Sequence, residues 1–109
     1  MSNVKTVEAG NFESEVVQSA EPVIVDFWAP WCSPCRMLSP VLDRAAEKFS
    51  GKVKFVKCDI DENPALASQF GVMTIPNLIF FKNGQVVDQA VGYVSETQLS
   101  DKVQRVLGS

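Results

Sequence analysis

The sequence predicts an α/β layer fold whose sheet contains both parallel and antiparallel strands. Strand patterns and helix patterns alternate between residues 22 and 71, which is the order of a βαβ unit. Farther along, two apolar runs flank Asn83-Gly84, the pair most typical of a tight antiparallel turn. With 46% hydrophobic and 21% charged residues, the 109 residues can bury a core. We therefore expect a single domain over residues 1–109.

The first two elements follow from apolar spacing. Residues 11–18 carry apolar side chains at helical steps, and Asn11 stands where a helix cap is expected. Residues 22–28, PVIVDFW, are mostly β-branched and aromatic with little alternation, as in a strand that is covered on both faces. Asp26 is the only polar residue in this strand. A short helix and a buried strand are predicted.

A long amphipathic helix is expected next, and it should end near Gly51. Its apolar face consists of residues at three- and four-residue steps: Met37, Leu38, Val41, Leu42, Ala45, Ala46 and Phe49. Pro40 lies inside this segment and predicts a kink, because proline lacks the N–H that a helix interior uses. Residues 52–60 alternate between polar and apolar and predict the following strand.

The carboxyl-terminal half continues with a helix, a hairpin and a second helix. Asn63 as the cap and Pro64 at the first helical position start the short helix. The two antiparallel strands of the hairpin lie within residues 77–92. Ser95 and Gln98 have the spacing of a capping box, which predicts that the last helix begins there.

Charge and hydropathy exclude several classes of function. Ten Lys and Arg residues stand against thirteen Asp and Glu residues, for a net charge of −3, and the cations are scattered. No phosphate-binding stripe is formed, so we expect no nucleic-acid partner. The apolar runs are shorter than the ~20 residues of a membrane helix. The opening MSNVKTVEAG lacks the pattern of a secretory signal. We expect no membrane association and a cytoplasmic location.

Two cysteines in WCSPC, residues 31–35, are separated only by Ser33 and Pro34. A zinc site needs about four ligands, mostly Cys and His, and this chain has three Cys and no His. A structural disulfide between Cys32 and Cys35 would close a short ring and add little stability. Thiol–disulfide exchange is the remaining use of such a pair, and we expect no metal.

The position of the pair supports this interpretation. Pro34 favours the first turn of a helix, so Cys32 should lie at the helix N-terminus, where unpaired N–H groups collect. A charge there gains roughly 0.3 to 2 kcal/mol, which lowers a thiol pKa of ~8.5 by about 0.2 to 1.5. We expect Cys32 to face solvent and to attack, and Cys35 to be partly covered. No cation lies between them, which favours a reductant over an oxidant.

The segments VDFWAP, WCSPC, TIPNLIFFKNGQ and VGY resemble the thioredoxin family in order and spacing, over nearly the whole chain. The resemblance implies a thioredoxin fold, with a central mixed β-sheet of five strands flanked by four helices and the cysteine pair at the carboxyl end of the second strand. It also implies a monomeric protein-disulfide reductase without a bound cofactor. Cys32 would form a mixed disulfide with a target protein, and Cys35 would resolve it. A thioredoxin reductase, either an NADPH flavoprotein or a ferredoxin-linked enzyme, would restore the dithiol.

Ser33 replaces the more familiar Gly and should tune the redox potential, by capping the helix or by donating to the Cys32 sulfur.

Asp26 and Lys57 are candidate residues for proton transfer. Asp26 lies among apolar neighbours, so desolvation should raise its pKa and let it accept the Cys35 proton. The alternative is a carboxylate turned toward solvent. Lys57 is expected to tune Asp26, although an exposed lysine at a strand end fits the pattern equally well.

A second group of residues is expected to bind the substrate. Trp31 precedes the cysteines and suits contact with a protein partner, whereas core packing is the usual role of tryptophan. By resemblance, the Ile75–Pro76 bond is cis, and the Ile75 backbone pairs with an extended substrate segment. Val91 and Gly92 are expected at the edge of the same surface; the alternative for Gly92 is a turn.

Three alternatives remain open from the residues. Cys58 is interpreted as a small buried hydrophobic residue, and a regulatory thiol is the other possibility. The protein could be a thiol oxidase or isomerase, which a redox potential would distinguish. It could also be a binding module in which the thiols are incidental, although binding alone requires neither the cysteines nor Asp26.

Overall fold

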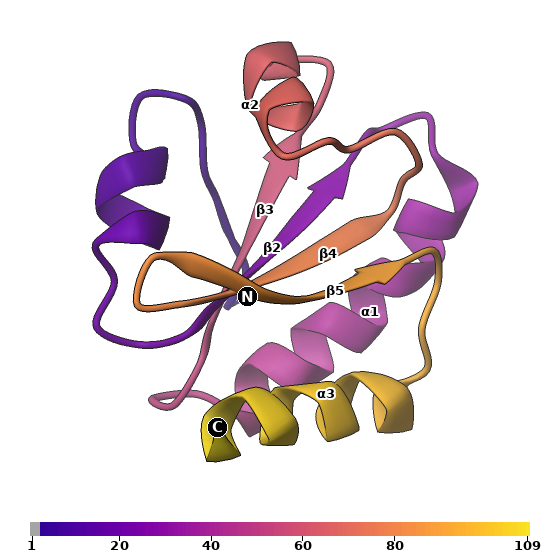
Figure 1. Cartoon of the computed structure of the whole chain (residues 1–109). Helices are drawn as coiled ribbons and strands as arrows, with labels where there is room; N and C mark the ends of the chain where they lie inside the picture. The colour runs from indigo at the N-terminus through magenta and orange to yellow at the C-terminus, as the bar shows by residue number, and fades with distance from the viewer. Residues whose placement is uncertain (1–2) are drawn as a thin grey trace.

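The computed structural model describes residues 3–109, and its centre is one mixed sheet (Figure 1). The strands are β1 (Lys5–Thr6), β2 (Val23–Trp28), β3 (Lys54–Asp59), β4 (Asn77–Lys82) and β5 (Gln85–Val91). They lie in the order β1-β3-β2-β4-β5. β3 runs parallel to both β1 and β2, whereas β4 is antiparallel to β2 and β5 is antiparallel to β4. The predicted five-stranded mixed sheet is confirmed.

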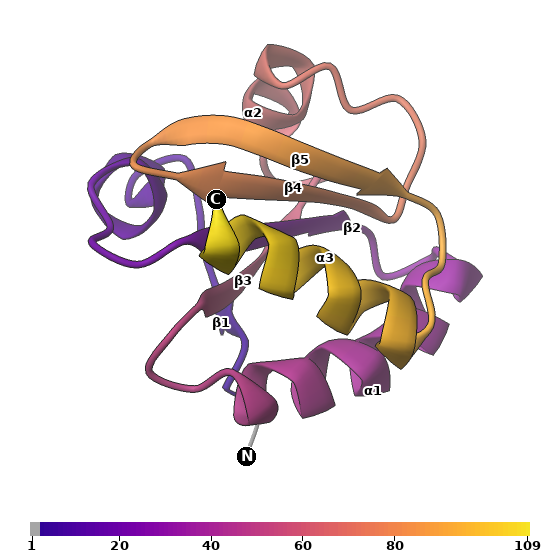
Figure 2. The ribbon, with the colours of Figure 1, turned by 60° about the horizontal axis from the view of Figure 1, so that its bottom comes forward.

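Four helices cover the two faces of this sheet (Figure 2). α1 (Ser33–Lys48) and α3 (Glu96–Gly108) pack on one face, and η1 (Glu13–Val17) and α2 (Pro64–Gln69) pack on the other. The core under α1 and α3 includes Ile24, Leu38, Leu42, Phe55, Leu78, Phe80, Leu99 and Val103. The core under η1 and α2 includes Phe12, Val16, Val25, Phe27, Val56, Cys58, Leu66 and Phe81. The thioredoxin-type arrangement implied by the resemblance is therefore confirmed.

The expected helix cap at Asn11 is wrong, whereas Asn63 holds its expected cap position without a side-chain capping hydrogen bond. η1 is a single π-type turn capped at Phe12, and the Asn11 side chain instead accepts the Glu8 N–H at 2.7 Å. Asn63 does hold the cap position of α2, but its side-chain oxygen accepts the Ala9 N–H at 2.9 Å and does not cap the helix. The side chains of Asn11 and Asn63 thus bind the backbone of the segment before η1. These hydrogen bonds replace the helix-capping ones, because a side-chain amide can bind other backbone groups as well as a helix end.

The predicted turn and capping box are both confirmed. Asn83 and Gly84 have φ angles of 54° and 77°, the left-handed conformation that a tight hairpin turn requires. A Cβ on Gly84 would lie 2.8 Å from the Val17 carbonyl oxygen, so glycine is also required by close packing. Ser95 Oγ accepts the Gln98 N–H at 3.2 Å, and the Ser95 N–H donates to Gln98 Oε1 at 2.9 Å.

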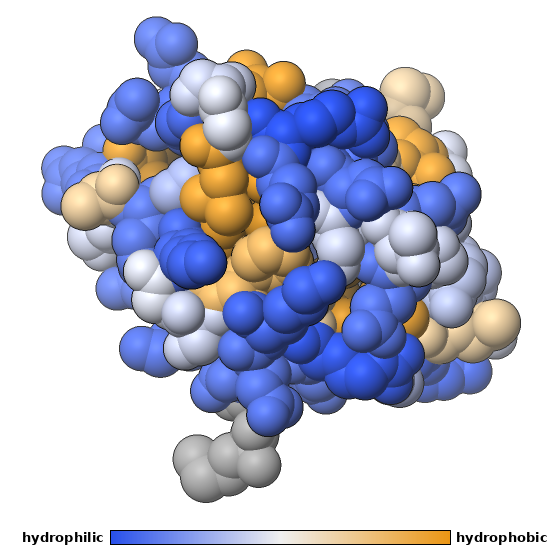
Figure 3. Space-filling view, turned by 90° about the horizontal axis from the view of Figure 1, so that it is seen from below, coloured by the Kyte–Doolittle hydropathy of each residue, from blue (hydrophilic) through white to orange (hydrophobic). Residues whose placement is uncertain are grey.

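The outer face of α1 and α3 is mainly polar, with apolar side chains visible in gaps between polar ones (Figure 3). Arg44 of α1 and Glu96 of α3 form an ion pair at 2.6 Å across this face. Pro40 lies inside α1, where its predicted kink stays a prediction. None of the helices formed by residues 3–109 combines the length and apolarity needed to cross a bilayer.

Candidate functional site

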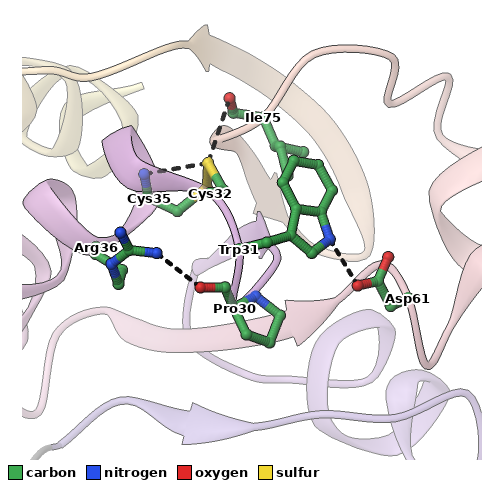
Figure 4. The surroundings of a disulfide bond; sticks show 7 residues. All are labelled: Pro30, Trp31, Cys32, Cys35, Arg36, Asp61 and Ile75. Carbon is green, nitrogen blue, oxygen red and sulfur yellow. Dashed lines mark hydrogen bonds between the residues drawn. A yellow bond between two sulfur atoms is a disulfide. The ribbon is translucent and has the colours of Figure 1, made fainter.

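The two cysteines lie where β2 leads into α1, and they form a disulfide with a Cα–Cα distance of 5.3 Å (Figure 4). Cys32 is the N-cap residue of α1, and its sulfur accepts the Cys35 N–H at 3.2 Å. Pro34 lies in the first turn, as predicted. Because the sulfur itself caps the helix, the proposal that Ser33 caps it is wrong; Ser33 is the exposed first residue of α1.

Exposure does not distinguish the two cysteines in the disulfide form, contrary to the sequence-based expectation. Cys32 is 5% exposed and Cys35 is 3% exposed. Ala29, Trp28 and Ile75 pack against the pair, and Ile75 comes from a loop 43 residues away that the local pattern could not place. Their chemical roles must therefore follow from the helix N-terminus and from their neighbours.

Two side-chain hydrogen bonds hold the loop before Cys32 (Figure 4). Arg36 Nη1 donates to the Pro30 carbonyl at 2.8 Å, and Trp31 Nε1 donates to Asp61 Oδ2 at 2.8 Å. Trp31 nevertheless remains 66% exposed, as expected for a residue that contacts a partner at the surface. Sequence reasoning missed Arg36 and Asp61. Arg36 directly follows the cysteine motif, so its position next to Cys35 was the available signal. Asp61 lies 30 residues from Trp31 in the sequence, and no local pattern pairs the two.

The loop before β4 and the end of β5 complete the surface around the disulfide. The Ile75–Pro76 bond is cis, as the resemblance implied. The Ile75 carbonyl oxygen lies 3.8 Å from Cys32 Sγ, so the thiol of a reduced Cys32 has an acceptor there. The Gly92 N–H donates to the Pro76 carbonyl at 2.8 Å, and Val91 is exposed beside it. Ile75, Pro76, Val91 and Gly92, all expected to bind the substrate, therefore lie close together, and Ile75 contacts Cys32.

Asp26 is buried, at the wall of a cavity of about 240 Å³. The cavity is also lined by Cys35, Ser39 and Lys57. Burial raises the pKa of Asp26 to about 7, and the Lys57 charge opposes part of this rise. Asp26 Oδ1 has no hydrogen-bond partner among the described residues. The carboxyl group can therefore gain or lose a proton near neutral pH, in a cavity that Cys35 also lines.

Lys57 lies beside Asp26 in the sheet, since the two residues are register partners of β2 and β3. Its Nζ atom is 5.1 Å from the centroid of the Trp28 ring. Trp28 is half-buried against the cysteines, and its Nε1 is a second buried polar atom without a described partner at this cavity. The arrangement places one cation near the carboxyl group without a direct ion pair between them.

Cys58 follows Lys57 in β3 and lies on the face of the sheet that η1 and α2 cover, where it is completely buried. Burial first, and then the negative charges of Glu8 and Asp59, raise the pKa of its thiol to about 11. The interpretation as a buried hydrophobic residue is confirmed. Residues 3–109 contain no group of three or more His, Cys, Asp or Glu side chains suited to a metal ion.

Comparisons with known proteins agree with this geometry. A family model described as Thioredoxin matches residues 3–105. Thioredoxin 1 of Nostoc sp. is 50% identical over 107 residues, which cover 98% of this chain and all of that protein. Thioredoxin of Haemophilus influenzae is 52% identical over 101 residues, covering 93% of this chain and 94% of its own. Thioredoxin of Alicyclobacillus acidocaldarius is 48% identical over 102 residues, covering 94% and 96%.

Proposed function

The chain belongs to the thioredoxin family, and from this premise we propose a role for each residue of the site. The protein is a protein-disulfide reductase whose redox pair is Cys32 and Cys35. One observation carries the mechanism: the pair spans the N-terminus of α1, and Cys35 shares a cavity with the buried carboxyl group of Asp26, whose pKa is raised to about 7 by burial.

In the first step, the Cys32 thiolate attacks one sulfur of a disulfide in a target protein. The target S–S bond breaks, a mixed disulfide forms on Cys32, and one target thiolate leaves. The Cys35 N–H and the helix N-terminus favour the thiolate of Cys32, because its sulfur already caps α1. Ser33 and Pro34 affect the potential through the geometry of this first turn.

In the second step, Cys35 gives its proton to Asp26 and attacks Cys32 Sγ. The mixed disulfide breaks, the second target thiolate leaves, and the Cys32–Cys35 disulfide forms, so two electrons have passed to the target. Support for Asp26 as the proton acceptor comes from the shared cavity and from its pKa of about 7, since a base works best near the ambient pH. Lys57 tunes that pKa downward.

The target docks over the surface around the pair. Trp31 offers a large apolar contact held by Asp61, and the Ile75 backbone next to Pro76 pairs with an extended segment of the target. Val91 and Gly92 border the same surface. These positions make the binding site a shallow surface, which suits a protein substrate.

The partners are proteins that contain accessible disulfides, together with a reductase that is an NADPH flavoprotein or is linked to ferredoxin. The protein acts as a single-domain monomer in the cytoplasm and uses no bound cofactor.

Turnover of a protein disulfide such as insulin tests the proposal. Cys32→Ser should reduce the rate at least about a thousandfold, because the nucleophile is lost. Cys58→Ser is the matched control, since it removes a thiol that lies outside the site. Equal rates for wild type and Cys32→Ser would remove the enzymatic mechanism and leave a binding module.

A second measurement separates the roles of the two cysteines. Cys35→Ser should accumulate the mixed disulfide with a target, because the resolving thiol is missing; failure to capture any target would contradict the two-step exchange.

A third measurement distinguishes a reductase from an oxidase or isomerase. A redox equilibrium with glutathione should give a potential well below that of disulfide isomerases. A value in the isomerase range would favour an oxidase or isomerase instead.

A further inference from the structure

The sulfur atoms of the disulfide form differ sharply in their access to solvent. Cys32 and Cys35 are bonded to each other, and Cys58 is completely buried. Within residues 3–109 the other sulfur-containing side chains are Met37 and Met73, which are 62% and 95% exposed. When the disulfide is closed, an oxidant in solution therefore reaches these two thioethers first.

Met73 lies on the docking side of the molecule. It is located in the loop between α2 and β4, two residues before Ile75, whose carbonyl oxygen is 3.8 Å from Cys32 Sγ. It borders a mainly apolar hollow on the surface together with Ile60, Pro64, Ala67, Ser68, Gly71 and Val72. Ile60 also packs against the cluster of Ala29, Cys32 and Cys35, so one side chain links the hollow to the surroundings of the disulfide.

Methionine suits such a position for a physical reason. Its side chain is unbranched, flexible and polarizable, so it adapts to apolar groups of different shape. Oxidation to the sulfoxide turns the same side chain into a polar one, and this weakens apolar contacts. Met37 is exposed as well, but it is part of α1, directly after Arg36, and it does not line this hollow.

We propose that Met73 is an oxidation site that controls the docking of target proteins; this rests on the function proposed above. A peroxide transfers one oxygen atom to the thioether sulfur: the O–O bond breaks, an S–O bond forms, and the peroxide is reduced to water or an alcohol. The sulfur loses two electrons and becomes a sulfoxide. A methionine sulfoxide reductase, supplied with two electrons, reverses the change.

The effect should appear in substrate binding more than in chemistry. Met73 does not touch the reacting sulfur atoms, so the exchange step itself should keep its rate. Losing one apolar contact between Met73 and the bound target is expected to raise KM for a protein disulfide about threefold to tenfold, with little change in kcat. A small aromatic disulfide does not extend to the hollow and should be reduced at an unchanged rate.

The experiment treats the disulfide form with hydrogen peroxide, locates sulfoxides by mass spectrometry, and then assays insulin and dithiobis-nitrobenzoate after reduction of the pair. Each protein is compared with its own untreated sample. Wild type and Met37→Leu should show the rise in KM for insulin, whereas Met73→Leu should not respond to peroxide. Met73→Gln, which is polar without oxidation, should have the raised KM before treatment.

Two results would overturn the inference: an unchanged KM for insulin with Met73 fully converted to the sulfoxide, or an equal peroxide response in Met73→Leu. Failure of the proposed function would look different, because the untreated protein would then reduce neither disulfide.

Discussion

Cys32 and Cys58 are almost equally buried, with 5% and 0% of their surfaces exposed, but they differ in the polar groups around them. Cys32 Sγ caps a helix and accepts a backbone N–H from Cys35. Cys58 is the penultimate residue of β3, where apolar side chains surround it and the charges that act on its thiol, on Glu8 and Asp59, are negative.

The comparison teaches that burial alone does not decide the reactivity of a thiol. The backbone donors and the dipole at the start of α1 favour a negative charge on Cys32. Desolvation and two carboxylates disfavour such a charge on Cys58 and raise its pKa to about 11. The same protein can therefore keep one cysteine reactive and another inert.

The largest expected effect concerns Asp26, a buried residue that lines a cavity together with Cys35. The difference between its pKa of about 7 in the folded protein and its ordinary value of 3.8 corresponds to about 4 kcal/mol of folding free energy. Because the folded pKa is raised, stability decreases as the pH rises from about 4 to above 7. Asp26→Asn cannot ionise, so it should exceed wild type by about this amount at pH 8 and match it near pH 3. Denaturant unfolding of the disulfide form across this range measures the difference.

Asp88→Asn is the control for this prediction. Asp88 is paired with Lys102, and its pKa is lowered, so the variant should gain no stability at pH 8. A difference between Asp26→Asn and wild type that does not change with pH would contradict the proposed protonation behaviour of Asp26.

The next effect concerns Cys58, the inert side of the comparison. Cys58→Ala removes one buried sulfur from the core and should lower the free energy of unfolding by about 1 to 2 kcal/mol. Turnover of insulin should stay within about twofold of wild type, because the site lies on the other face of the sheet. A loss of turnover larger than the loss of folded protein would instead indicate a functional thiol.

The smallest effect concerns Arg36, which holds the loop before Cys32 through the Pro30 carbonyl. Arg36→Met should lower insulin turnover about twofold to threefold, since an exposed charge-assisted hydrogen bond contributes at most about 1 kcal/mol. Arg44→Met removes the same charge from the outer face of α1 and should leave turnover unchanged. Equal losses in both variants would assign the effect to net charge.

Local patterns predicted the parts of the fold whose causes are local. The Asn83-Gly84 turn, the Ser95 capping box and the placement of Cys32 at the start of a helix depend on neighbouring residues. β1 was not predicted, because its two exposed residues carry no apolar pattern and pair only through β3.

The remaining errors share a cause, which is contact between distant parts of the chain. The side chain of Asn63 forms hydrogen bonds with Ala9 and Glu8 and none that caps its own helix. Ile75 covers the disulfide from another loop, so Cys32 is less exposed than its sequence neighbours suggest. The burial of Asp26 was predictable from its strand, whereas the cavity that joins it to Cys35 and Ser39 depends on how α1 crosses the sheet.

Alkylation of the reduced protein by iodoacetamide at pH 7 tests most directly whether the start of α1 activates Cys32. We expect Cys32 to react about threefold to tenfold faster than free cysteine, because a larger fraction of it is thiolate. Cys58 should remain unmodified until the protein unfolds. A Cys32 rate equal to or below that of free cysteine would contradict the account.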